Sequence, residues 1–236
     1  MPEVRNAKIG PIRRWAQERP FLFLTVALLV IMMCMPLATT KLSRLIFVEL
    51  NFLMVLGVAV SATGNRRIYV KWALYLWIIS ASLDVIAYFW DMPRFREWLQ
   101  LVNELSSLTF LLGATAFLLR FILRAERVNT NSVFAATSSY ILLALVWAYA
   151  YSLTDLFDPQ AFSGINHAAG SSRVDLVYFS VVTITTLGYG DISPLSPFAR
   201  MLAAVESLVG QLYLAVLVAW LVGLTISNRQ MKKRGG

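Results

Sequence analysis

The chain has 236 residues, of which 58% are hydrophobic and only 14% are charged. A water-soluble domain carries about a quarter charged residues, so this composition favours a membrane protein. The formal net charge is +8, but the basic residues lie between apolar runs rather than in one patch, which argues against a nucleic-acid partner. One cysteine, Cys34, and one histidine, His167, exclude an intrachain disulfide and a cysteine or histidine metal cluster, so a metalloenzyme is not expected.

A spanning helix needs about 20 mostly apolar residues. Six stretches meet this length and are predicted spans: 21–38, 45–63, 69–90, 98–119, 133–152 and 198–227. A basic leader, residues 1–20, precedes the first stretch. No small-residue cleavage site follows the first stretch, so we interpret this stretch as a retained span and not as a signal peptide.

The orientation of the spans follows from lysine and arginine, which are enriched on the cytoplasmic side. With the N-terminus inside, the inner segments hold 15 of the 21 basic residues: Arg5, Lys8, Arg13, Arg14, Arg19, Arg66, Arg67, Lys71, Arg120, Arg124, Arg127, Arg229, Lys232, Lys233 and Arg234. We therefore predict a multi-pass plasma-membrane protein that contacts membrane lipids and has both termini in the cytoplasm. The compact chain favours a prokaryotic inner membrane.

The connection between the last two predicted spans differs from the others. Residues 153–173 are polar and rich in turn formers, and residues 174–185 are apolar but too short to cross a bilayer. Such a stretch is typical of a re-entrant helix, and the glycine-containing segment after it is tolerated at membrane depth only if it lines a cavity. The predicted fold is an all-α membrane protein. Four peripheral helices (21–127) precede a two-helix pore module (133–227), and a short cytoplasmic tail (228–236) follows.

The segment 183–191 reads T-I-T-T-L-G-Y-G-D. It resembles the selectivity-filter signature of the tetrameric potassium channel family, T-x-x-T-x-G-Y-G-D, and the stretch V-D-L-V-Y-F-S-V-V from Val174 is similar to that family's pore helix. The resemblance covers 133–227, whereas residues 1–130 share only four expected spans with the family. It implies a homotetramer that conducts K⁺ passively, without catalysis or an organic cofactor.

The residue types of this segment suit the dehydration of K⁺, because rings of backbone carbonyls replace the water of the ion. Consecutive carbonyls point the same way only if alternate residues have opposite-handed backbones, which glycine adopts without penalty. Positive φ is therefore expected at two glycines of the segment. The candidate ion-binding residues are Thr186, Leu187, Gly188, Tyr189 and Gly190, and K⁺ is expected at the first four. The candidate supporting residues are Thr183, Thr185 and Asp191.

Asp191 has two open interpretations. It attracts cations at the outer mouth, or it accepts a hydrogen bond behind the filter. The ring of Tyr189 is expected to turn away from the pore and pack behind the filter.

The last predicted span carries three gating candidates, Glu206, Gly210 and Gly223. An ionisable residue inside a span is a functional hypothesis by default, and protonation of Glu206 is a candidate gating event. The alternative for Glu206 is a shallow, solvated position, and the alternative for Gly210 is a packing glycine at a close helix crossing. The candidate cavity-lining residues are Gln211, Leu214, Val218 and Val222.

The predicted fourth span has no lysine or arginine between Trp98 and Leu119, so an arginine-rich voltage sensor is not recognisable. We therefore expect a channel that is not strongly voltage-gated. Three alternatives remain: a non-selective cation channel, favoured by Leu187 where valine or isoleucine is commoner, a potassium transporter subunit, and a non-conducting scaffold.

Overall fold

The computed structural model describes residues 20–37, 71, 74, 75, 78, 79, 82, 93–124, 129–167 and 172–234. Its helices are α2 (Pro20–Cys34), the 3₁₀ turn η1 (Met35–Leu37), α5 (Pro93–Leu123), α6 (Thr130–Phe157), α7 (Ser172–Ile184) and α8 (Pro197–Arg234). Two short strands, β1 (Phe162–Ser163) and β2 (Ser193–Pro194), pair antiparallel. The leader residues 1–19 and the predicted span 45–63 lie outside the described residues. So does most of the span 69–90, where the described positions 71, 74, 75, 78, 79 and 82 are helical.

Four helices of the described part are long and apolar enough to cross a membrane: Pro20–Leu37, Trp98–Leu123, Thr130–Phe157 and Pro197–Trp220. They match the first, fourth, fifth and sixth predicted spans. The chain is thus a mostly helical, multi-pass membrane protein, and the short apolar stretch before the glycine segment forms the helix α7, as expected.

The observed helices extend beyond the predicted spans because hydropathy marks only their apolar part. Helix α5 begins at Pro93, since proline is well suited to the first helical turn. Asn129 caps α6, with its side chain accepting from the Ser132 amide at 2.8 Å. Helix α8 continues to Arg234 and so includes residues 228–234 of the predicted tail.

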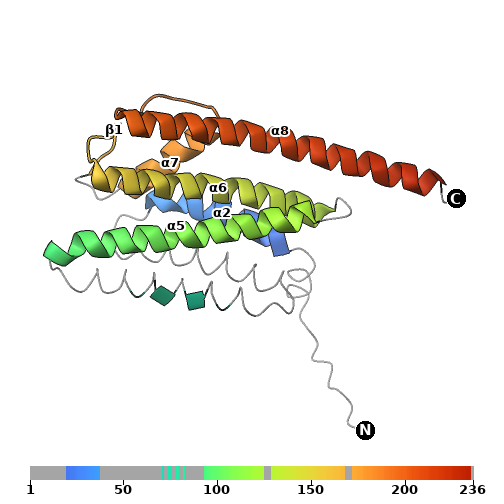
Figure 1. Ribbon diagram of the computed structural model, residues 1–236, viewed down its shortest axis with the longest axis horizontal. Coiled ribbons are helices and arrows are strands. Elements are labelled where there is room, and N and C mark those ends of the chain that lie inside the picture. Colours follow the sequence, from blue (N-terminus) through green and yellow to red (C-terminus); the bar gives the residue numbers. More distant parts are fainter. Residues whose placement is uncertain are drawn as a thin grey trace, which may run out of the picture.

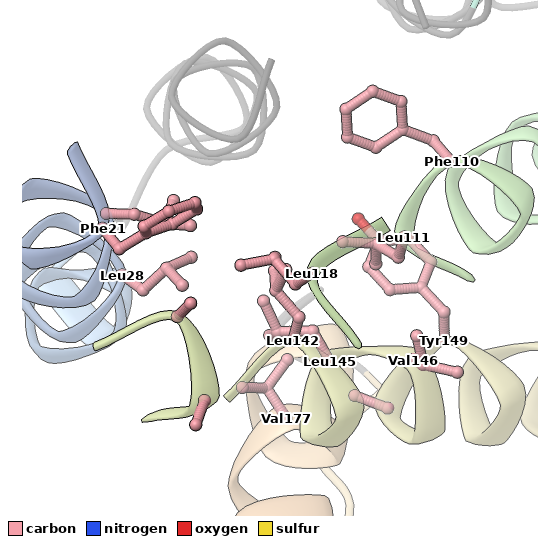
Figure 2. Close-up of a cluster of buried hydrophobic side chains, with 14 of the residues drawn as sticks. Phe21, Leu28, Phe110, Leu111, Leu118, Leu142, Leu145, Val146, Tyr149 and Val177 are labelled. Atoms are coloured by element: carbon pink, nitrogen blue, oxygen red, sulfur yellow. The ribbon is translucent and has the colours of Figure 1, made fainter. Parts of the chain in front are cut away.

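Helix α6 is the central element of the bundle. Figure 1 shows α2 and α5 along one side of α6, with the short α7 between α6 and the long α8. The main apolar core joins α2, α5, α6 and one residue of α7, and Figure 2 shows Phe21 and Leu28 facing Leu118, Leu142 and Val177.

A second, smaller core joins α6, β1, α7 and the start of α8. It contains Tyr151, Phe162 and Phe179, whose rings meet edge-on at centroid distances of 5.0 to 5.6 Å. This aromatic cluster connects α6, the loop after α6 and α7. It therefore gives α7 a firm base just before the segment 185–191.

Candidate functional site

The segment 185–191 directly follows α7 and is hydrogen-bonded to the last turn of that helix. The Thr186 amide donates to the Thr183 carbonyl at 2.9 Å, and the amides of Leu187 and Gly188 both donate to the Val182 carbonyl, at 2.9 and 3.3 Å. The negative pole of α7 therefore lies beside the start of the segment, where it favours a cation. The Thr185 hydroxyl donates to the Val181 carbonyl at 2.7 Å, so it is used to end the helix.

The backbone of the segment alternates in hand. φ is +58° at Thr186, +59° at Gly188 and +80° at Gly190, whereas the intervening Leu187 and Tyr189 have negative φ. The positive φ predicted for the two glycines is confirmed. Such alternation of backbone hand is the pattern that lets successive carbonyls point to the same side of a strand.

Thr186 was not expected to be left-handed, a conformation that costs a residue with a side chain about 1–2 kcal/mol. Contacts of its hydroxyl accompany this conformation. Thr186 Oγ1 donates to the Thr185 carbonyl at 2.7 Å and accepts from Gln211 Nε2 at 3.3 Å. Gln211, a predicted cavity-lining residue, thus reaches the N-terminal part of the segment.

The side chains of Leu187 and Tyr189 are uncovered in the single chain. Their exposed fractions are 55% and 68%. The described residues of the same chain therefore do not cover the Tyr189 ring, which was expected to pack behind the filter.

Contacts of Asp191 fix the C-terminal end of the segment. Tyr178 of α7 donates to Asp191 Oδ2 at 2.7 Å, and this hydrogen bond lowers the pKa of the Asp191 carboxyl. Gly164, with φ +83°, lies so close that a Cβ there would sit 2.2 Å from the Asp191 carbonyl oxygen. The pairing of Ser163 with Ser193 continues this contact. Sequence reasoning missed Tyr178 and Gly164, because a tyrosine and a turn glycine carry no signal of their distant partner.

Helix α8 presses closely on the end of α7. A Cβ at Gly210 would lie 2.5 Å from the Ile184 carbonyl oxygen, so this position makes a close backbone contact; its role as a gating hinge stays a prediction. The hydroxyls of Ser207 and Tyr140 donate to the carbonyls of Thr183 and Ile184 at 3.2 and 2.9 Å. The last turn of α7 is thus fixed by α6 and α8 together.

Glu206 is fully buried between α6, α7 and α8, where it contacts Tyr151 and Ser180. The solvated position considered for it is not observed. By contrast, Gly223 has open space around it. The predicted cavity-lining residues are all exposed on α8: Gln211, Leu214, Val218 and Val222.

The geometry, an alternating carbonyl strand on a re-entrant helix between two long apolar helices, defines an ion-channel pore domain. Comparison with protein families agrees, because residues 137–226 match the family model described as "Ion channel". The match covers less than half of the chain, and the family that it describes is one of ion channels and not of enzymes.

The curated relatives include potassium channels. The chain is 42% identical to the two-pore potassium channel 5 of Arabidopsis thaliana over 31% of its own length and 17% of that protein. It is 29% identical to the voltage-gated potassium channel Kch of Escherichia coli over 53% of its length and 27% of that protein. It is 28% identical to the protein LctB of Bacillus caldotenax over 39% of its length and 72% of that protein. The chain thus spans much less than half of both potassium channels. No solved structure gives a significant match.

Proposed function

We propose that this chain is the subunit of a potassium-selective channel, in which four copies surround one pore and conduct K⁺ passively. The observation that carries the proposal is the alternating backbone at Thr186, Gly188 and Gly190, in a segment that reads T-L-G-Y-G-D. Carbonyls aligned in this way replace the water of a dehydrated K⁺ ion. The Thr186 hydroxyl adds an oxygen at the inner end.

Apolar side chains that are exposed in the single chain support the proposed tetramer. One chain supplies one strand, and a closed ring of carbonyls needs several. In the tetramer, the exposed side chains of Leu187 and Tyr189 then pack against neighbouring copies. Large apolar residues are also exposed along α8: Phe198, Met201, Val205, Leu208, Leu212, Leu214, Val216, Val218, Val222 and Ile226. One part of this surface contacts neighbouring subunits, and another part lines the cavity.

The proposal includes six spans with both termini in the cytoplasm of a prokaryotic cell. On this topology Arg173 and the segment 185–191 lie at the outer side. Cysteines introduced singly at Asp158 and Lys232, in a chain with Cys34 replaced by serine, test it. We expect a membrane-impermeant thiol reagent to label intact cells at position 158 only.

Reconstitution of the purified protein in planar bilayers tests the function directly. With K⁺ on one side and Na⁺ on the other, the reversal potential should lie close to the K⁺ equilibrium potential, and Ba²⁺ should block the current. Chemical cross-linking should stop at four times the 26.5 kDa of one chain. A bilayer that stays silent with correctly assembled protein would favour the scaffold instead.

A non-selective cation channel is the second candidate, because Leu187 stands where valine or isoleucine is commoner, and a leucine there would loosen the packing of the filter. This candidate predicts a reversal potential near zero under the same gradient. The variant Leu187→Val then separates the two functions. It should leave a potassium-selective wild type unchanged, whereas it should increase selectivity if the leucine loosens the filter.

A further inference from the structure

Glu206 lies at the meeting point of the three helices of the pore module. Its carboxyl is fully buried, with Tyr151 of α6 on one oxygen and Ser180 of α7 on the other. Ser180 Oγ also lies 2.6 Å from the carbonyl oxygen of Ala144. The ion pairs of the described residues, Glu104 with Arg173 and Asp155 with His167, do not involve Glu206.

The number of protons in this cluster reveals the state of the carboxyl. The cluster contains three hydrogen bonds: Tyr151 to Glu206, Ser180 to Ala144, and the contact between Ser180 and Glu206. Tyrosine and serine supply one proton each, and the Ala144 carbonyl supplies none. Ser180 Oγ is within donor distance of both Glu206 Oε1 and the Ala144 carbonyl, but it has one proton for the two acceptors. All three hydrogen bonds can form together only with a proton on Glu206, which would then donate to Ser180 Oγ while Ser180 donates to Ala144.

The surroundings of Glu206 favour the same state. A buried carboxylate is very costly unless a cation or several donors accompany it. The titratable groups that face Glu206 from α6 are the hydroxyls of Tyr151 and Tyr140, which are neutral at physiological pH. On α7, Arg173 pairs with Glu104 and Asp175 accepts from the Asn166 amide, both at the outer end of the helix. On α8, Arg200 contacts the Pro194 carbonyl, and Tyr213 contacts Ser139 and the Ala136 carbonyl.

We propose that Glu206 is held as a neutral carboxylic acid and is a positioning residue for α7, and through α7 for the filter. As a neutral acid it lets Ser180 of α7 hydrogen-bond to Ala144 of α6 and to Glu206 of α8 at the same time. From Ser180 the helix leads directly to the Val182 carbonyl, which accepts the amides of Leu187 and Gly188. Loss of the proton would leave two protons for three contacts, so Ser180 would release either Ala144 or Glu206. The filter backbone would then shift with α7.

The protonation state is tested by infrared spectroscopy, with no need for conduction. The difference spectrum between the wild-type tetramer and Glu206→Gln at pH 7 should show a carboxylic-acid C=O band that the variant lacks. This band should shift in D₂O. A pair of carboxylate bands in its place would overturn the proposal.

The positioning role rests on the proposed function and is tested by the K⁺/Na⁺ permeability ratio. Glu206→Gln keeps a donor and an acceptor, so it should keep the wild-type ratio, whereas Glu206→Leu and Ser180→Ala should reduce it by tenfold or more. His167→Ala, on the exposed outer loop, is the matched control and should have no effect. A normal ratio in Glu206→Leu would contradict the proposal, as would loss of the ratio in Glu206→Gln.

An alkaline titration links the two measurements. The wild-type permeability ratio should stay constant as long as the acid band persists and fall where the band disappears, while Glu206→Gln stays constant throughout. A ratio that survives the loss of the band overturns the positioning role. If even the wild type shows no K⁺ current, the proposed function fails. The infrared spectrum and the thermal stability of Glu206→Gln and Glu206→Leu still decide whether a neutral acid joins the helices.

Discussion

The helices next to the segment 185–191 and the helices α2 and α5 are attached to α6 by different kinds of contact. Next to that segment, α7 and α8 are joined to α6 by buried or partly buried hydrogen bonds from Tyr140, Tyr151 and Ser180. On the other side, α2 and α5 meet α6 mainly through apolar side chains. The polar contacts there include the hydroxyl pair of Thr25 and Ser138 at 2.8 Å.

The difference follows from what each region has to hold. Hydrogen bonds are directional and fix the distance between two atoms closely, whereas apolar burial rewards removal from water with little demand on angle. In the proposed channel, a carbonyl strand that replaces the water of an ion needs fixed positions. We therefore expect substitutions near α7 to change selectivity, and substitutions near α2 and α5 to change stability first.

The largest effect is expected from Gly188→Ala. At φ +59° a methyl group is strained, and the carbonyl must leave its alignment to relieve the strain. Potassium selectivity or conduction should be lost while membrane insertion is kept. Bilayer recording and membrane fractionation measure the two properties, and a wild-type permeability ratio in this variant would remove the segment from the ion path.

Gly210→Ala and Gly223→Ala form a matched pair on α8. The first adds a Cβ at 2.5 Å from a backbone oxygen of α7, and the second adds it in open space. We expect Gly210→Ala to destabilise the protein by about 1–3 kcal/mol through overpacking. Gly223→Ala should be neutral or stabilise by up to about 1 kcal/mol, because alanine favours the helix. Thermal unfolding in detergent measures both, and equal midpoints would show that the close approach at Gly210 is absent.

Arg173→Gln tests a polar link between α5 and α7. Arg173 pairs with Glu104 of α5 and lies 5.4 Å from the centre of the Tyr149 ring. Its loss leaves a buried carboxylate without its cation. Because Arg173 itself is partly exposed, we expect a loss of about 1–2 kcal/mol. The pair of Asp155 and His167, in which the histidine side chain is 44% exposed, provides the control, since Asp155→Asn should shift the unfolding midpoint less.

Tyr178→Phe tests the outer mouth through pH. The hydrogen bond from Tyr178 lowers the pKa of Asp191 from its ordinary value of 3.8, so the contact is fully present above that pH and is lost as the pH falls through the lowered value. Without the hydroxyl, the pKa returns toward 3.8, and the acid-induced change in conductance should begin at a higher pH. Asp191→Asn should abolish that change. An identical onset in wild type and Tyr178→Phe would show that the hydrogen bond does not affect the mouth.

The smallest effect is expected from membrane voltage. The apolar part of α5 between Trp98 and Leu119 contains no basic residue, whereas arginine-rich sensors move roughly three to four charges per subunit at about 2.3 kcal/mol per charge per 100 mV. The limiting slope of open probability against voltage should therefore be shallow. A slope equivalent to several charges per channel would assign a voltage-sensing role to the outer helices.

The sequence by itself determined the features that depend on local chemistry. Apolar runs of spanning length predicted four helices that the structure describes, and the shorter run from Val174 predicted α7. The positive φ of Gly188 and Gly190 was predictable because only the missing side chain makes that backbone inexpensive. The ends of α5 and α8 were not, since polar residues continue a helix without changing the hydropathy of its span.

Only the tertiary structure decided what surrounds these features. The sequence marks Glu206 as an acid in a span, but its partners Tyr151 and Ser180 lie on two other helices, far from it along the chain. The same holds for the contact of Gly164 with Asp191 and for the left-handed Thr186 beside Gln211. Each of these depends on how helices cross, and crossing is set by side chains from several segments at once, so no local pattern encodes it.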